Sequence, residues 1–162
     1  MTKEEIITIL NEIPDPEIPV LSIIDIGIFR DVIFENQKIK IIITPTYSGC
    51  PAMNDIENSI IKKLNTCGLT DISVEYVFHP VWTTDSMSEE TKEKLKSYGI
   101  APPTLKSNNF NILNIIEKDV IFHCPYCNSI ETKKTSEFGS TACKSLHFCF
   151  SCNQPFEHFK CH

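Results

Sequence analysis

The chain has 162 residues, of which 41% are hydrophobic and 22% are charged. This length and composition predict one ordinary folded domain with a small addition and argue against a disordered chain. No segment reaches the ~18 consecutive apolar residues that mark a membrane-spanning helix. Residues 1–5 are polar apart from Met1 and lack the apolar core of a secretory signal peptide. We therefore expect a cytoplasmic protein that does not enter the membrane.

The net charge of −6 is unevenly distributed along the chain. Residues 1–105 carry 9 Lys+Arg against 16 Asp+Glu, a net of −7, and residues 106–162 carry 6 against 5, a net of +1. Binding to the phosphates of a nucleic acid requires clustered positive charge. The acidic first part therefore argues against a nucleic-acid partner.

The first residues predict a short amphipathic helix. Thr2 and Glu5 have the spacing of a capping box, and the apolar residues that follow share one helical face. Pro14 and Pro16 end this helix, because proline cannot continue a helix and restricts the residue before it. We expect residues 15–19 to form a stiff, extended loop.

Two strands, a helix and a third strand follow in the pattern. Residues 28–35 and 38–44 have strand-like sequences joined by a short polar turn, and residues 72–78 alternate in the same way. Between them, Pro51 begins a helix that Gly68 ends. The order α-β-β-α-β predicts a small α+β domain with helices packed on a three-stranded sheet.

A polar helix is expected near residues 88–98, followed by Pro102, Pro103 and a polar stretch. This composition predicts three parts. Residues 1–104 form the α+β domain, residues 105–122 form a linker, and residues 123–162 form a cysteine-rich, zinc-ribbon-like β domain.

The cysteine-rich tail carries the strongest motif. Six of the eight cysteines lie between Cys124 and Cys161, including two C-x-x-C pairs separated by 21 residues. The four residues of these pairs are Cys124, Cys127, Cys149 and Cys152. In a reducing compartment this pattern favours metal binding over disulfides, and the thiolates suit Zn²⁺. The intervening residues are long enough for a β-hairpin, and a structural zinc ion would let so small a domain fold.

Two features of the tail remain open from the pattern alone. The same four thiolates could hold an Fe–S cluster, because spacing does not distinguish the two. Cys143 and Cys161 fall outside the pairs. They are either small buried residues or additional ligands, and the nearby histidines are more often packing or surface residues.

A second motif, Thr46-Tyr-Ser-Gly-Cys50-Pro51, precedes the second predicted helix. We expect Cys50 at the N-cap, where the helix dipole would lower the pKa of the thiol. The alternative is an ordinary cap within a turn. Asp15 and Glu17 form a rigid carboxylate pair that matters only if the fold brings it beside Cys50.

Several segments carry a resemblance to known proteins. The segments Asp15-Pro-Glu-Ile-Pro19, Ser22 to Ile28 and Thr46 to Pro51 resemble the small domain of iron–sulfur assembly proteins of the SufT type. The segments Trp82-Thr-Thr-Asp85, Lys94 to Pro103, Phe138 to Lys144 and Pro155 to Cys161 are similar to the PaaD/PaaJ family of the bacterial phenylacetyl-CoA epoxidase system. Together the segments cover nearly the whole chain.

The resemblance implies an accessory role in aerobic phenylacetate catabolism, outside the catalytic oxygenase core. The implied role is maturation of a partner's Fe–S cluster, with the Fe–S reductase subunit as the expected recipient. Carried over by position, Cys50 is the assembly-domain cysteine and Asp15 its partner, and Glu17 and Thr46 complete the cluster-transfer candidates. One cysteine cannot hold a cluster alone, so a transient cluster requires ligands from the tail, from another subunit or from a second copy in a homodimer.

Two other functions stay open from the sequence. The chain could be a non-catalytic docking module of the multicomponent oxygenase. It could instead be an electron-transfer protein with an Fe–S centre in its tail, which predicts a coloured protein.

Overall fold

The computed structural model describes residues 1–35, 38–47, 49–103 and 122–160. The chain forms two compact units, Met1–Lys94 and Leu95–Cys161, and helix α3 (Glu89–Ser97) crosses the point of division. Nearly all of the predicted linker 105–122 lies outside the described residues, and the boundary expected near residue 104 stays a prediction. In the described part of the chain, no helix has the length and apolarity needed to cross a membrane.

Helix α1 (Lys3–Leu10) begins with the predicted capping box. The Thr2 hydroxyl accepts a hydrogen bond from the Glu5 backbone N–H at 3.3 Å, and the Glu5 carboxylate accepts one from the Thr2 N–H at 2.7 Å. These bonds satisfy two donors that the first turn leaves unpaired. Ile6 and Leu10, one turn apart, are fully buried and fix the helix to the core.

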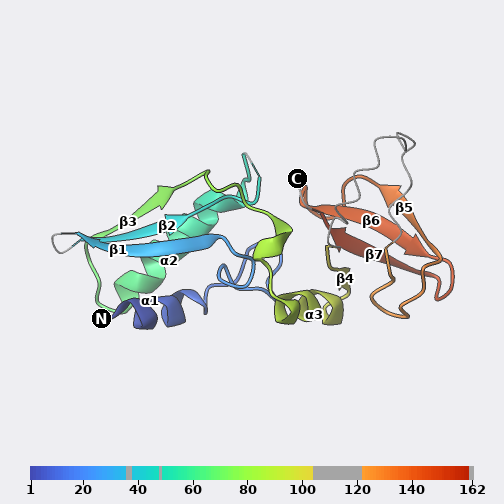
Figure 1. Ribbon diagram of the computed structural model, residues 1–162, viewed down its shortest axis with the longest axis horizontal. Helices are drawn as coiled ribbons and strands as arrows, with labels where there is room; N and C mark the ends of the chain where they lie inside the picture. The colour runs from blue at the N-terminus through green and yellow to red at the C-terminus, as the bar shows by residue number, and fades with distance from the viewer. Residues whose placement is uncertain (36–37, 48, 104–121, 161–162) are drawn as a thin grey trace. The chain divides into compact units, whose positions relative to one another are not determined.

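The N-terminal unit contains a three-stranded sheet in the order β1-β2-β3 (Figure 1). Strands β1 (Phe29–Glu35) and β2 (Lys38–Ile43) are antiparallel, whereas β3 (Ile72–Tyr76) runs parallel to β2. A parallel pair requires a long crossover, and helix α2 (Ala52–Thr66) provides it. Together with α1, these elements confirm the predicted α-β-β-α-β order.

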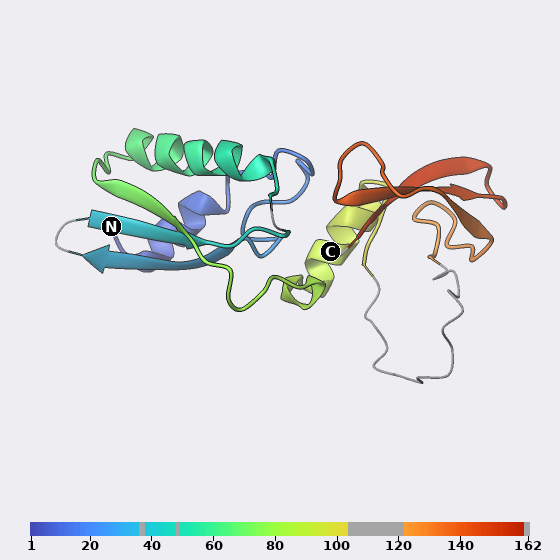
Figure 2. The same ribbon diagram turned by 90° about the horizontal axis from the view of Figure 1, so that it is seen from above.

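The core of this unit lies between α2 and the sheet (Figure 2). On α2 the buried positions recur at helical spacing, and on β2 alternate residues are fully buried. The fully buried members are Ile41, Ile43, Ile60 and Leu64. Close packing of these branched side chains holds α2 against β2.

Strand β1 contains one irregularity. Phe29 pairs with Ile43 and Asp31 pairs with Ile42, so Arg30 is an extra residue with no partner position on β2. Such a bulge redirects side chains and is common beside functional sites. The guanidinium of Arg30 donates a hydrogen bond from Nη2 to the Pro80 carbonyl at 3.3 Å.

The segment 15–19 is folded, so the predicted extended loop is wrong. The Asp15 carboxylate accepts hydrogen bonds from the backbone N–H groups of Glu17 at 2.9 Å and Ile18 at 2.8 Å. The Asp15 N–H donates to the Leu21 carbonyl at 2.8 Å. Aspartate forms turns in this way because its short side chain reaches the backbone two or three residues on. The prolines are compatible with the turn, because they remove N–H donors that it does not use.

The C-terminal unit is a four-stranded sheet in the order β4-β7-β6-β5. Strands β5 (Thr132–Ser136) and β6 (Lys144–Cys149) form the predicted hairpin, and β7 (Gln154–Phe159) pairs antiparallel with β6. Strand β4 (Ile100–Ala101) lies parallel to β7. The short 3₁₀ helix η1 (Thr84–Ser86) and α3 precede this sheet in the chain. An α+β domain with a zinc-ribbon-like β tail is therefore confirmed.

Candidate functional site

The two C-x-x-C turns, which we call knuckles, bring four sulfur atoms together. The Sγ atoms of Cys124, Cys127, Cys149 and Cys152 all lie within 4.8 Å of one another. The separations are 3.7 Å between Cys124 and Cys152 and 3.5 Å between Cys127 and Cys149. A tetrahedron with metal–sulfur bonds of ~2.3 Å has edges of about 3.8 Å, so the four sulfurs fit one tetrahedral ion.

Each knuckle ends in the same backbone conformation. Asn128 follows Cys127 with φ of 61°, and Asn153 follows Cys152 with φ of 56°. Asparagine tolerates this left-handed conformation better than most residues because its side chain bonds locally. In the first knuckle the Asn128 N–H donates to the Cys124 carbonyl at 2.9 Å. An asparagine after each C-x-x-C pair is therefore a sequence signal for these turns.

The charge state of the cluster favours a bound cation. Burial opposes ionisation of Cys149, yet hydrogen bonds from the Cys152 N–H and the Cys127 thiol lower its pKa to about 7. Burial and the neighbouring thiols raise the pKa of Cys152 to about 12. Four thiolates at this spacing repel one another, and a divalent ion offsets that repulsion. The donor set suits Zn²⁺ or iron.

The additional ligand candidates lie outside this group. Cys143 is buried, and its sulfur contacts the Thr141 hydroxyl at 3.1 Å. It does not belong to the metal-binding group found among the described residues, and Cys161 lies outside them. His147 lies against the Ser145 hydroxyl at 2.9 Å and stacks on Phe156, as expected for a packing role.

The Cys50 loop precedes helix α2. The N-cap of α2 is Pro51, so the prediction that Cys50 occupies the N-cap is wrong. Cys50 lies one residue earlier, in a turn where its N–H donates to the Tyr47 carbonyl at 3.3 Å. Its carbonyl accepts a hydrogen bond from the Met53 N–H at 3.4 Å. The loop thus holds Cys50, which is half-buried, at the helix entrance.

The pKa of Cys50 is raised, so the predicted lowering is also wrong. Burial is the largest cause, and the backbone N–H of Ala52 opposes it. The negative charge of Glu17 raises the pKa, the Tyr47 hydroxyl lowers it and Asp15 raises it again. Burial and two carboxylates outweigh the helix entrance. The fold therefore brings Asp15 and Glu17 close enough for their charges to act on Cys50.

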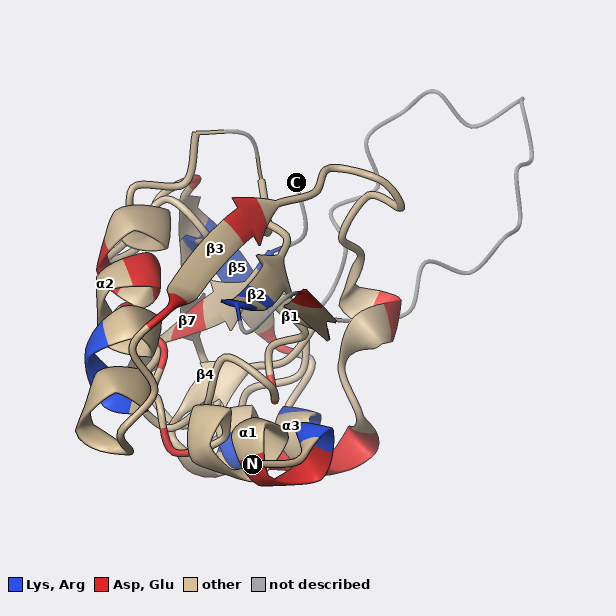
Figure 3. Ribbon diagram, turned by 90° about the vertical axis from the view of Figure 1, so that its left-hand side faces the viewer, with Lys and Arg blue, Asp and Glu red and all other residues tan. Residues whose placement is uncertain are grey.

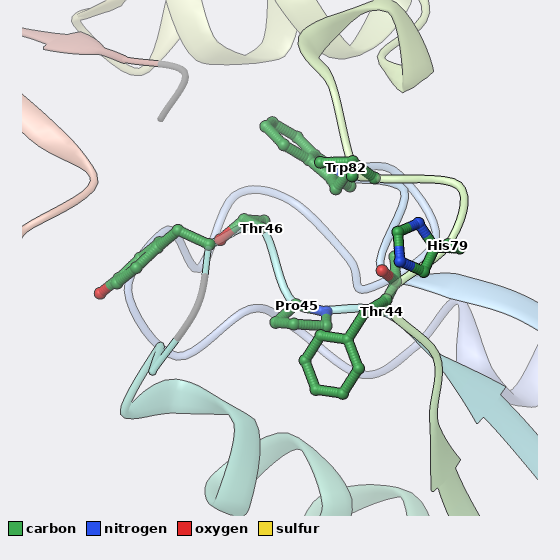
Figure 4. A pocket seen from close by; sticks show the side chains of 8 residues that line it. Thr44, Pro45, Thr46, His79 and Trp82 are labelled. Carbon is green, nitrogen blue, oxygen red and sulfur yellow. The ribbon is translucent and has the colours of Figure 1, made fainter.

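The same loop also lines a pocket that the sequence did not indicate. Its two walls are the segment from Thr44 to Tyr47 and the segment from Phe78 to Trp82 (Figure 4). The volume is about 390 Å³. The lining residues are Thr44, Pro45, Thr46, Tyr47, Phe78, His79, Val81 and Trp82. Thr46, a predicted site residue, therefore lies on the pocket wall, and the aromatic run after β3 was the missed signal.

Two family models match different parts of the chain. Residues 3–76 match the family model "Iron-sulfur cluster assembly protein", and residues 114–160 match "PaaD zinc beta ribbon domain". The chain is 44% identical over 157 residues to an Escherichia coli K12 protein named as a component of "Putative 1,2-phenylacetyl-CoA epoxidase", covering 97% of this chain and 92% of that protein. The chain belongs to the PaaD family of the phenylacetyl-CoA epoxidase system. The resemblance seen in the sequence is thereby confirmed.

Other relatives match little more than half of this chain. An "Fe-S protein maturation auxiliary factor" of Porphyromonas gingivalis is 31% identical over 96 residues, which are 58% of this chain and 90% of that protein. A solved structure described as "Domain of Unknown Function DUF59" from Bacillus anthracis is 30% identical, with a TM-score of 0.52. It covers 57% of this chain and 90% of its own. The PaaD chain thus joins an assembly-type domain to a zinc-ribbon tail.

Proposed function

We propose that this chain is a non-catalytic accessory protein of the phenylacetyl-CoA epoxidase system that helps to mature the Fe–S cluster of a partner subunit. The observation that carries the proposal is that the charges of Glu17 and Asp15 act on Cys50 at the entrance of α2. This site lies in the part of the chain whose relatives are named Fe–S maturation factors. Its cargo is iron or a cluster, and the recipient is another protein.

The charges around Cys50 suit a thiol that ionises on contact with its cargo. Before the cargo arrives, burial and the carboxylates favour the protonated thiol. An iron cation attracted by Glu17 would replace the proton, forming an iron–sulfur bond while the proton leaves to water. Because one thiolate is too few for a cluster, the remaining ligands come from the recipient or from a second copy of the chain. Such a weak hold permits release.

The tail has a separate role in this proposal. Cys124, Cys127, Cys149 and Cys152 would hold Zn²⁺, which supplies folding free energy to a sheet with a small core. The described core cluster of this unit consists of Ala101, Cys124, Cys149 and Phe156, with Cys152 packed against it. Two of the four buried members of that cluster, and the residue packed against it, are therefore metal-ligand candidates. Loss of the ion would unfold the tail and leave the assembly site folded.

The recipient in this proposal is the Fe–S reductase subunit of the same system, in the cytoplasm, where thiols stay reduced. The test is to express that subunit with the wild-type chain or with Cys50→Ser and to measure its iron, acid-labile sulfide and visible absorbance. We expect reduced cluster content with Cys50→Ser while the two proteins still form a complex. Cys67→Ser is the matched control, because Cys67 is exposed in the same unit. Equal cluster loading with Cys50→Ser and wild type would contradict the proposal.

A docking module is the second candidate function, and one observation favours it. Each knuckle carries an exposed aromatic residue, Tyr126 at 57% and Phe150 at 58%, and Ile130 is equally exposed. Exposed apolar groups on a small domain often mark a protein contact. Under this reading Phe150→Ser abolishes complex formation, and Cys50→Ser changes neither complex formation nor cluster content.

An Fe–S electron carrier is the third reading. It is tested by metal and sulfide analysis of anaerobically purified protein. One zinc ion per chain without visible absorbance supports the structural role of the tail. Iron with sulfide and a reversible redox signal would instead make the tail the active part.

A further inference from the structure

The pocket beside the Cys50 loop has a pre-formed wall. The Trp82 indole donates a hydrogen bond to the Ile26 carbonyl at 2.9 Å, and Trp82 is 2% exposed. Arg30, the bulge residue of β1, holds the Pro80 carbonyl of the same segment. Two long-range bonds therefore fix the segment from Phe78 to Trp82, one to β1 and one to the loop before β1. A rigid wall of this kind binds with little loss of conformational entropy.

A buried hydroxyl in the pocket wall lacks a hydrogen-bond partner among the described residues. Thr44 lines the pocket, is 1% exposed, and its hydroxyl has no hydrogen-bond partner among the described residues. A buried hydroxyl without a partner destabilises the fold, so such groups are rare unless water or a ligand satisfies them. The other neighbours are mostly apolar or aromatic. This composition suits a ligand that is apolar but carries one hydrogen-bonding group.

The rim of the pocket is apolar and accessible. Phe78 is 57% exposed and Val81 is 65% exposed, although both lie in a segment fixed to the sheet. Adjacent apolar side chains at the mouth of a pocket are typical of protein contacts rather than of ordinary surface. The pocket mouth therefore continues onto a surface that a partner could cover.

Charge indicates the nature of the partner. Residues 1–94 carry 8 Lys+Arg against 16 Asp+Glu, a net of −8. Figure 3 shows acidic positions on α2 and β3, and the charges of Glu17 and Asp15 act on Cys50. Tyr47 joins the pocket to Cys50, because it lines the pocket and its carbonyl accepts a hydrogen bond from the Cys50 N–H at 3.3 Å. A basic segment is the complementary partner.

We propose that this pocket receives an apolar side chain from a basic segment of the recipient protein, with a main-chain amide of that segment hydrogen-bonded to the Thr44 hydroxyl. The inference rests on the proposed function, since it assumes that a recipient docks beside Cys50. It adds the place of docking and its chemistry. An occupant anchored here lies against the loop that presents the thiol, so docking and transfer share one structural element.

The single tryptophan makes the pocket directly observable. The chain contains one Trp, so protein grown with 5-fluorotryptophan gives one ¹⁹F signal, from Trp82 in the pocket wall. Unlabelled recipient protein without its cluster is added, and the ¹⁹F shift is followed together with the dissociation constant. We expect the signal to move on binding and binding to weaken as salt is raised. An unmoved signal in a saturated complex would overturn the proposal.

Three variants separate the parts of the contact. Val81→Asp places a charge at the rim and should weaken binding at least tenfold. Thr44→Val keeps the shape but removes the hydroxyl, and we expect a loss of roughly three- to tenfold. Phe34→Asp is the control, because Phe34 is 52% exposed in the same unit but lies near the opposite end of the β1–β2 hairpin. Its binding should stay within twofold of wild type.

Other outcomes would contradict the proposal. Unchanged affinity in Val81→Asp would exclude this surface, and unchanged affinity in Thr44→Val would show that water satisfies the hydroxyl. A small organic molecule in native mass spectra that is lost in Val81→Asp would show that the pocket is a small-ligand site. The proposed function is tested by a separate measurement. If Cys50→Ser matures the recipient normally, maturation is excluded, while the binding measurements still decide where the recipient docks.

Discussion

The negative charge of Glu17 acts on the Cys50 thiol, and together with burial it raises the pKa of that thiol. The two residues come from different turns, and the Asp15 side chain shapes the turn that carries Glu17. The thiol is therefore held in its protonated form by its surroundings. A cation or a basic partner that neutralises Glu17 would favour the thiolate.

Glu17→Gln should move the alkylation profile of Cys50 to lower pH. Removing a negative charge next to a thiol stabilises the thiolate, so the pKa falls and iodoacetamide reacts at a lower pH. The rate at Cys50 is followed by mass spectrometry of its peptide from pH 6 to 10. Glu35→Gln, at the exposed end of β1, should leave the profile unchanged. An identical profile for Glu17→Gln and wild type would contradict the electrostatic coupling.

Cys149→Ser should release the metal and unfold only the C-terminal unit. A fully buried thiolate ligand cannot be replaced by the weaker, neutral hydroxyl. Metal content is measured after gel filtration, and amide exchange is compared between β2 and β6. Cys143→Ser should retain the metal, since Cys143 lies outside the four-sulfur group. Metal loss in Cys143→Ser would instead make it a ligand.

Ile60→Ala should lower the free energy of unfolding of the N-terminal unit by about 2–5 kcal/mol. Ile60 is fully buried under the sheet, so the shorter side chain loses apolar burial and leaves a cavity. The neighbouring Ile61 is only partly buried, and Ile61→Ala should cost clearly less because less apolar area is lost. Urea denaturation of both variants, compared at equal m-values, tests the difference.

The stability of the C-terminal unit should fall as the pH drops below about 6.5, the ordinary pKa of histidine. Burial, aided by the charges of His147 and Lys160, lowers the pKa of His158 to about 3, so the folded state keeps this imidazole neutral. The unfolded state binds the proton first. The free energy of unfolding therefore decreases with falling pH across this window.

His158→Phe should reduce that pH dependence, because the titrating group is removed. Phenylalanine can keep the stacking on Phe122, whose ring centroid lies 3.7 Å from that of His158. Denaturant unfolding of metal-loaded protein at pH 5 and 6.5 gives the slope, and acid release of the metal affects both proteins alike. His79→Gln is the control for an exposed histidine. Equal slopes in His158→Phe and wild type would show that another group is responsible.

The sequence predicted the features that depend on local periodicity or spacing. The capping box of Thr2 and Glu5, the alternating strand β2 and the α2 crossover all follow from patterns within a few residues. The convergence of four cysteines was predictable for a different reason. Two C-x-x-C pairs joined by a hairpin leave little freedom in where the sulfurs lie.

The features that depend on distant residues were not predictable. The pKa of Cys50 depends on Glu17 and Asp15, more than thirty residues earlier in the chain, and on burial. The unpaired Thr44 hydroxyl becomes significant only when the segment after β3 covers it. The turn of Asp15 was misread because proline spacing indicates stiffness but does not reveal which acceptor its neighbours will use.

The two-residue strand β4 has a practical consequence for anyone who studies the zinc ribbon by itself. Ile100 and Ala101 occupy one side of β7, opposite Glu157 and His158. A fragment cut after these residues would expose the backbone donors and acceptors of β7 to other molecules, and open strand edges of this kind promote aggregation. A fragment that starts at Leu95 keeps the edge covered. Insolubility of a shorter one would reflect the cut rather than the zinc site.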